Sequence, residues 1–203
     1  MKHRFLLLAL LLGMATISVS SQTQNPSDCY KYMQKAAKDG DVLSTLAYSL
    51  QYIRLDPGST SGYFYYGNAN MNRELYWNAL SGFTKILDMA PDYKQVYYNR
   101  SIAFGAVGFD ALQLQDLNRA LDLDPDYAWA YVSRAAYYLK NGEIDAFWTD
   151  TKKAISLEPN SPYIYMNIAE LHRGEMRYDS AYHYLNKVIS LDTDFAEAYL
   201  NRA

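Results

Sequence analysis

The chain has 203 residues, of which 50% are hydrophobic and 15% are aromatic, enough apolar material for a folded core. Its 21 tyrosines argue against a disordered chain, because disordered segments are poor in aromatic residues. The formal charge is −3, so the composition gives no general attraction for nucleic acid or anionic lipid.

Residues 1–21 have the features of a secretory signal peptide. Lys2 and Arg4 give a positive start, an apolar run covers residues 5–19, and small residues precede the expected cleavage after Ser21. That run is shorter than the roughly 20 residues needed to span a bilayer. We therefore expect an exported protein, periplasmic or extracellular, with no membrane span in the mature chain. An uncleaved N-terminal anchor is the alternative.

The rest of the chain repeats at a constant interval. Four equally spaced prolines mark it: Pro57, Pro91, Pro125 and Pro159. Between them, apolar residues recur at helical spacing in two runs per block. Glycine stands at the turn between the two runs in three blocks, at Gly40, Gly108 and Gly142. The pattern predicts helix pairs at 27–38 and 41–54, 60–73 and 76–88, 94–107 and 110–122, 128–140 and 144–156, and 162–174 and 178–190.

This pattern resembles the tetratricopeptide repeat, whose motif is W-x2-L-G-x2-Y, then A-x3-F, then P, with a period of about 34 residues. The second block matches it best, with Tyr63, Tyr66, Gly67, Ala79, Phe83 and Pro91. The resemblance implies an all-α, right-handed α-solenoid of stacked helix-turn-helix repeats over residues 27–203, behind a linker at 22–26. The repeats are expected at about 26–59, 60–93, 94–127, 128–161 and 162–195. Gln113 and Phe147 replace a small alanine of the motif, so packing there must differ.

A sixth block begins at residue 196 and lacks its second helix. We expect a truncated repeat, as in a fragment of a longer chain, against the alternative of a frayed terminal helix. A longer regulatory or enzymatic protein, of which this chain is the docking or sensing part, is therefore an alternative function.

Two pairs of opposite charges recur with the repeat. Arg100 and Asp116 stand in the two predicted helices of one block, and Arg134 and Asp150 occupy the same two positions one repeat later. In blocks where the arginine is replaced by Tyr or Ile, the acid is replaced by Tyr or Gly. We predict half-buried structural ion pairs that join the two helices of one repeat.

Catalytic chemistry is not expected. The chain carries no phosphate-binding glycine loop, nucleophile elbow or H-E-x-x-H motif. The single cysteine, Cys29, excludes an intramolecular disulfide and a cysteine-based zinc site. His172 and His183 with Glu170 form a conceivable metal set, but packed histidines are the simpler interpretation. We expect no enzyme, no cofactor and no metal.

The resemblance implies a concave groove lined by the first helix of each pair. The residues assigned to it are mostly aromatic, apolar or amide-bearing: Tyr30, Phe64, Asn68, Gln95, Tyr98, Ile102, Trp129, Val132, Tyr163 and Met166. Phe64 and Trp129 stand where the family's carboxylate clamp has cations, so no acidic tail is expected as ligand. The predicted function is a scaffold that binds a protein or peptide. A carrier of carbohydrate is the alternative, and homo-oligomerisation is left open.

Overall fold

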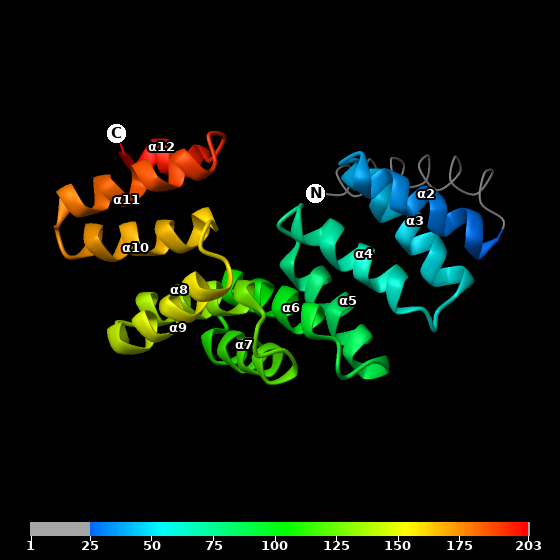
Figure 1. Cartoon of the computed structure of the whole chain (residues 1–203). Helices are drawn as coiled ribbons and strands as arrows, with labels where there is room; N and C mark the ends of the chain where they lie inside the picture. The colour runs from blue at the N-terminus through cyan, green and yellow to red at the C-terminus, as the bar shows by residue number, and fades with distance from the viewer. Residues whose placement is uncertain (1–24, 203) are drawn as a thin grey trace, which may run out of the picture. The chain divides into compact units, whose positions relative to one another are not determined.

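The described part of the chain, residues 25–202 of the computed structural model, contains helices and no strand (Figure 1). The predicted signal peptide lies outside these residues. The first helices of the repeats are α2 (Pro26–Lys38), α4 (Thr60–Met71), α6 (Lys94–Ala106), α8 (Ala128–Lys140), α10 (Pro162–Gly174) and α12 (Ala196–Arg202). The second helices are α3 (Val42–Leu55), α5 (Tyr76–Met89), α7 (Asp110–Leu123), α9 (Ile144–Leu157) and α11 (Tyr178–Leu191).

The period is constant in the structure. First helices begin at positions 26, 60, 94, 128, 162 and 196, and second helices at 42, 76, 110, 144 and 178, always at the same interval. The predicted helix pairs are confirmed, with ends displaced by one or two positions; the helix predicted at 60–73, for example, ends at Met71. The prolines fix this register because proline has no donor for the next helical bond.

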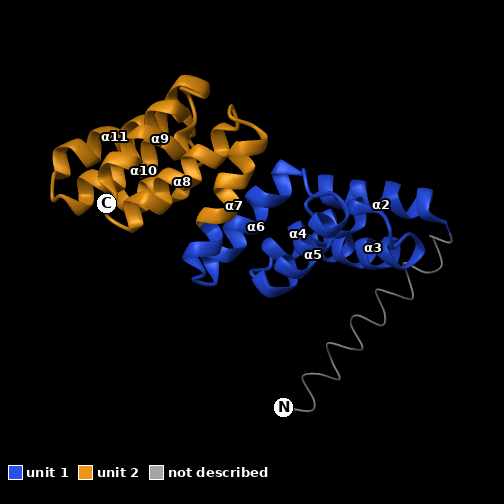
Figure 2. Cartoon of the chain, turned by 90° about the horizontal axis from the view of Figure 1, so that it is seen from below, with its two compact units in different colours: residues 1–113 blue, residues 114–203 orange. Residues whose placement is uncertain are grey.

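The chain divides into two compact units, residues up to Gln113 and residues from Leu114 onward (Figure 2). In the first unit α2 packs on α3 and α4 on α5, while α3 also packs on α4 and α5 on α6. In the second unit α8 packs on α9 and α10 on α11, and α8 also contacts α10. Within each unit, one hairpin therefore covers the next, which is the arrangement predicted for an α-solenoid.

Large apolar side chains fill the spaces between these helices. Phe83 is fully buried, and a Cβ atom added to Gly67 would lie 2.4 Å from its ring. The glycine of the motif is thus needed for close approach of α4 to α5. In the second unit Phe147 is also fully buried, in a cluster with Ile164 and Ile168. The phenylalanine that replaces the motif's alanine is accommodated as a core residue.

A tyrosine hydroxyl closes the loop before three of the first helices. Tyr97, Tyr131 and Tyr165 donate to the carbonyl oxygens of Pro91, Pro125 and Pro159, at 3.0, 3.1 and 2.7 Å. Each bond ties the loop to the helix that follows it. Part of the high tyrosine content is therefore structural.

The turn inside each hairpin requires a left-handed residue. Gly40, Gly108 and Gly142 have φ values of 72°, 81° and 74°. At the same position of the other two hairpins, Glu74 and Met176 adopt φ of 58° although they carry side chains. A hydrogen bond from the amide of the next residue closes the turn. In the second hairpin, the amide of Leu75 donates to the carbonyl of Asn70 at 2.9 Å.

Replacing either of these two residues by glycine should stabilise the chain. The left-handed conformation costs an ordinary residue roughly 1–2 kcal/mol, and the greater unfolded-state freedom of glycine offsets about half of that gain. We expect Glu74→Gly and Met176→Gly each to raise the free energy of unfolding by about 0.5–1 kcal/mol in urea titrations. Gly142→Ala, the opposite change, should lower it. A loss of stability in both glycine variants would contradict this account.

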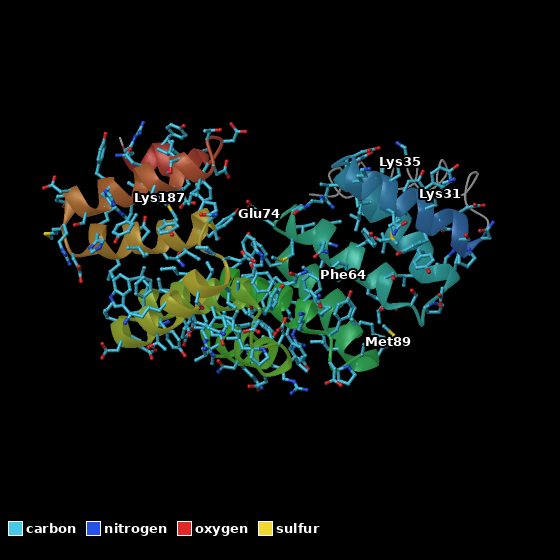
Figure 3. The ribbon with its side chains drawn as sticks, in the orientation of Figure 1. Lys31, Lys35, Phe64, Glu74, Met89 and Lys187 are labelled. Carbon is cyan, nitrogen blue, oxygen red and sulfur yellow. The ribbon has the colours of Figure 1, made fainter. Side chains whose placement is uncertain are left out.

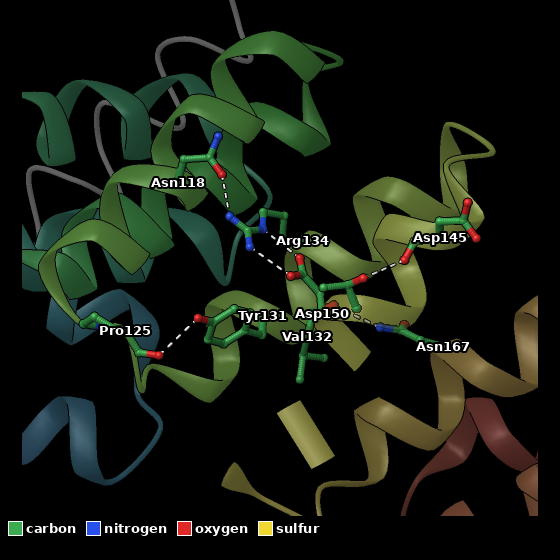
Figure 4. A network of polar contacts seen from close by, with 9 residues as sticks. Asn118, Pro125, Tyr131, Val132, Arg134, Asp145, Asp150 and Asn167 are labelled. Carbon is green, nitrogen blue, oxygen red and sulfur yellow. Dashed lines mark hydrogen bonds and ion pairs between the residues drawn. The ribbon is translucent and has the colours of Figure 1, made fainter. Parts of the chain in front are cut away.

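One of the two predicted ion pairs is present in full. Arg134 on α8 donates from Nε and Nη2 to the two carboxylate oxygens of Asp150 on α9, at 2.7 and 2.9 Å (Figure 4). Its Nη1 also donates to Oδ1 of Asn118 at 2.7 Å. The hydrogen bonds to Asp150 raise the pKa of Arg134 above its ordinary value, so the guanidinium stays charged. The arginine joins two helices of one repeat and the second helix of the repeat before it.

The other predicted pair joins residues of different units, Arg100 in the first and Asp116 in the second, and it stays a prediction. Within its own unit Arg100 donates to Thr84 Oγ1 at 3.2 Å. Its guanidinium lies over the rings of Tyr97 and Phe104, 5.6 and 5.5 Å from the ring centres. Thr84 precedes Arg100 by the same interval at which Asn118 precedes Arg134, so the contact to the previous second helix repeats.

Removing one partner of the Arg134–Asp150 pair should lower the free energy of unfolding by more than the intact pair contributes to it. The side chain of Asp150 is 5% exposed and that of Arg134 is 19% exposed, so Arg134→Ala leaves a buried carboxylate and should cost about 3 kcal/mol. In a double-mutant cycle with Asp150→Ala, we expect a coupling of about 1–2 kcal/mol in the free energy of unfolding. The exposed pair Lys35–Asp39 is the control, with coupling below about 0.5 kcal/mol. Additive costs at Arg134 and Asp150 would refute the structural role.

Across residues 25–202, the helices are all too short or too polar to cross a membrane.

Candidate partner-binding surface

In the second unit, aromatic rings line the beginning of the first helices. Trp129 on α8 and Tyr163 on α10 occupy the same repeat position and meet edge to face, with ring centres 5.3 Å apart. Tyr163 meets Phe195, next to α12, in the same manner at 5.1 Å. Edge-to-face contact is the favoured geometry for such rings. Trp129 is 38% exposed and Tyr163 is 46% exposed. We call Trp129, Tyr163 and Phe195 the aromatic row.

A hollow lies beside this row. It has a volume of about 450 Å³ and is lined by Trp129 and by the loop between α9 and α10: Glu158, Pro159, Asn160, Ser161 and Pro162. The loop is held in place by the bond from the Tyr165 hydroxyl to the carbonyl of Pro159. The two prolines have fixed φ angles, so one wall of the hollow is rigid.

The first unit has a different cluster on its first helices. Phe64 on α4, labelled in Figure 3, stacks on Tyr93, with ring centres 5.9 Å apart and planes 3° from parallel. Tyr65 meets Phe64 at 6.3 Å and Tyr30 of α2 at 6.5 Å. All four rings are half-buried, and Phe64 and Tyr93 also pack on the core cluster around Phe83. These rings give up more of their surface to internal packing than Trp129 and Tyr163 do.

Amide side chains link neighbouring first helices. In the first unit, Nδ2 of Asn99 donates to Oδ1 of Asn68 at 3.0 Å. In the second unit, Nδ2 of Asn201 donates to Oε1 of Glu170 at 3.3 Å, at the same two repeat positions. Asn167 instead donates to the backbone oxygen of Val132 at 3.0 Å (Figure 4). Each amide has further donor and acceptor capacity beyond the single bond described.

Two residues assigned to the groove from sequence belong to the interior. Val132 is only 7% exposed and packs with Phe147, and Met166 is 6% exposed and packs with Leu185. Residues of α9 and α10 surround Val132, and residues of α11 and α12 surround Met166, so a partner cannot reach their side chains. Gln95 is exposed, and Tyr98 and Ile102 are half-buried.

Sequence reasoning missed the aromatic residues that precede the first helices. Tyr93 and Phe195 stand two positions after Pro91 and Thr193, the same repeat position, and both contact rings of the groove set. That recurrence was visible in the sequence. It was overlooked because the groove was assigned from helix positions alone.

The histidines take structural positions. The ring of His172 stacks on Tyr184 at 5.5 Å and the ring of His183 meets the same tyrosine edge on at 5.3 Å. His172 is buried, and its Nδ1 lies 3.6 Å from Oε2 of Glu175. Within residues 25–202, no three histidine, cysteine or carboxylate side chains gather as metal ligands would.

Stacked hairpins of constant period define the chain as an α-solenoid. A model of the tetratricopeptide repeat family matches residues 117–146, which run from the second half of α7 through α8 to the first turn of α9. The same fold is found in solved structures at low sequence identity. The chain thus has the fold of the tetratricopeptide repeat proteins, and part of its sequence matches a model of that family. Comparison with curated protein sequences gives no match.

Three of the solved structures illustrate this likeness. PilW, described as a widely conserved type IV pilus biogenesis factor, has a TM-score of 0.75 at 17% identity, over 88% of this chain and 83% of its own. TTC0263, a thermophilic TPR protein of Thermus thermophilus, has a TM-score of 0.74 at 20% identity, over 87% and 96%. YrrB, a TPR protein with an unusual peptide-binding site, has a TM-score of 0.64 at 17% identity, over 92% and 96%. At these identities the likeness concerns the fold.

The burial of Met166 can be tested by stability. We expect Met166→Ala to lower the free energy of unfolding by about 2–4 kcal/mol, since it leaves a cavity between two hairpins. Gln95→Ala, at an exposed position of the same assigned set, should stay within about 0.5 kcal/mol of the parent. Chemical denaturation followed by circular dichroism measures both. If Met166→Ala leaves the stability unchanged, the residue is not in the core.

Proposed function

We propose that the chain is an exported scaffold that binds a partner protein or peptide on the aromatic row of its first helices. The observation that carries the proposal is the exposure of Trp129 and Tyr163, 38% and 46%, beside a hollow with a rigid proline wall. Large aromatic side chains in such a setting are the residues that dominate binding energies at protein interfaces.

The chemistry around the row favours an uncharged, partly extended ligand. Apart from Glu158, the residues lining the hollow are neutral, and the exposed amide of Asn160 can bond to a peptide backbone. An apolar side chain of the partner would enter the hollow while its backbone crosses the rings. The peptide-binding site of YrrB shows that this fold supports such a function in another protein. Proteins of this fold typically act as scaffolds rather than enzymes.

Export rests on the sequence of residues 1–21. A positive start, an apolar run of signal length and small residues before Ser21 are the features that direct secretion and cleavage. The partner is then expected in the periplasm or outside the cell.

A carbohydrate ligand is the second candidate. Trp129 borders a hollow that also contains Glu158, Asn160 and Ser161, and an aromatic face beside polar side chains suits a sugar as well as a peptide. The two ligands differ in their dependence on the row: an extended peptide uses both rings, whereas one sugar ring covers only one.

The experiment uses the complete chain, tagged at its carboxyl end and recovered after export. Affinity capture from cell-envelope extract identifies the partner, and titration calorimetry with the purified partner then measures Kd. Trp129→Ala and Tyr163→Ala should each weaken binding at least about tenfold, as expected for anchors at an interface, with unchanged helicity and melting temperature.

Tyr182→Ala is the matched control, because Tyr182 is 53% exposed but lies on a second helix, α11. It should bind as the parent does. A parallel glycan array tests the second candidate: saturable glycan binding lost in Trp129→Ala would replace the peptide proposal. Full partner affinity in both row variants would show that the partner binds elsewhere.

A further inference from the structure

The first unit contains a larger hollow on a different surface. It has a volume of about 710 Å³ and is lined by residues of α3, α4, α5 and α6, among them Leu50, Tyr66, Trp77, Gly82, Lys85 and Phe104. Most of the lining comes from α5, a second helix. The hollow is therefore lined by residues of the first unit and shares none of them with the aromatic row of the proposed function.

Gly82 lines this hollow and contributes no side chain to it. Tyr66 and Gly82 occupy the repeat positions that Arg134 and Asp150 hold two repeats later. Where the later repeat places a bidentate ion pair, this one places a tyrosine ring close against a glycine. A Cβ atom at Gly82 would lie 2.9 Å from Cδ1 of Tyr66. Here the Tyr66 ring stands in place of the ion pair, and Gly82 adds no side chain to the wall of the hollow.

Exposed apolar side chains border the hollow. Trp77 is 62% exposed, and its ring meets that of Phe109 edge on at 5.5 Å. Phe109 is 43% exposed and also contacts Phe104, at 6.3 Å, while Leu50 is 42% exposed. We call Leu50, Trp77, Phe104 and Phe109 the Trp77 patch.

The fold itself does not require this patch. Asp145 in the second unit has the repeat position of Trp77, and Glu143 has that of Phe109. Repeats of the same chain therefore keep their structure with carboxylates at these positions. Apolar residues at exposed positions where the fold tolerates charge indicate a surface that is covered in the working protein.

We propose that the Trp77 patch is a twofold interface between two copies of this chain. A twofold interface must be complementary to itself, because the same surface lies on both sides. Trp77 is both exposed and part of the wall of the hollow, so the same surface offers a ring to insert and a space to receive one.

The charges at the rim meet the same condition. Lys85 and Asp88 lie one helical turn apart on α5 and line the hollow; Lys85 Nζ is 3.9 Å from Asp88 Oδ2, and the two side chains are 51% and 62% exposed. In an antiparallel pair of α5 helices, Lys85 of each copy would face Asp88 of the other. A partner of a different sequence could bind with charges of one sign or with a protruding side chain alone. This surface carries charges of both signs, and it has both an exposed ring and a hollow.

A second copy of the chain is also available to bind the Trp77 patch wherever the protein is made. An apolar patch on an exported chain is exposed from the moment of folding, and another copy arrives with it at a fixed ratio. The resulting dimer would carry two aromatic rows, one in the second unit of each copy, which raises the avidity for a partner with repeated motifs.

The test measures the mass of the complete exported chain by light scattering after size exclusion, and by sedimentation velocity over a range of concentrations. We expect a dimer of twice the chain mass. Trp77→Asp, which installs the residue of Asp145, should weaken the dimer more than tenfold. Trp129→Ala and Tyr182→Ala, both at exposed aromatic residues of the second unit, should leave it intact.

A second variant fills the hollow with a side-chain pair already present in this chain. Tyr66→Arg with Gly82→Asp reproduces the pair of Arg134 and Asp150, and should likewise give a monomer with unchanged helicity. A parent chain that is monomeric at all concentrations overturns the proposal, and so does a dimer that survives both variants. A monomeric parent that binds a foreign protein through Trp77 would also overturn it, and would identify the surface as a heterologous site. Loss of partner binding in Trp129→Ala without loss of the dimer separates this proposal from the proposed function.

Discussion

One constraint shapes the whole chain: a single helical hairpin of this size cannot bury its own apolar stripe. Each hairpin depends on the next repeat for cover: Val132 shares a core cluster with residues of α10, and Met166 shares one with Ala198 of α12. Cover of this kind works only when successive hairpins arrive in the same register. The constant interval between helix starts follows from this need.

Several local devices hold the register. The bond from Tyr97, Tyr131 or Tyr165 to a proline carbonyl fixes the loop between hairpins. A left-handed residue fixes the turn within each hairpin, and the chain uses it even at Glu74 and Met176. The Arg134 guanidinium then connects α8 both to its own second helix and to the previous one. The tyrosine hydroxyl thus holds the loop between hairpins, and the left-handed backbone residue holds the turn within a hairpin. The guanidinium holds the contacts between helices.

The sequence was informative wherever a physical requirement recurs in every repeat. Helix pairs and turns were predicted because proline, glycine and apolar spacing recur with the repeat, and the Arg134–Asp150 pair because both charges appear and disappear together. Burial of Val132 and Met166 was not predictable in this way, since it depends on how closely the next hairpin approaches. The left-handed turns at Glu74 and Met176 were missed because the signal sought was glycine. The hollow at Gly82 depends on where one tyrosine ring lies.

The tyrosines show how structure narrows a functional hypothesis. A ring whose hydroxyl holds a loop is unavailable as a movable contact, so Tyr97, Tyr131 and Tyr165 are poor anchors for a partner. Tyr32 and Tyr48 stack on each other at 5.7 Å, in the repeat positions where Arg134 and Asp150 form their ion pair. Once these roles are assigned, the exposed aromatic residues on the first helices of the second unit are few, and Trp129 and Tyr163 stand beside a hollow. A surface rich in tyrosine therefore reduces to a small number of rings that a ligand can use.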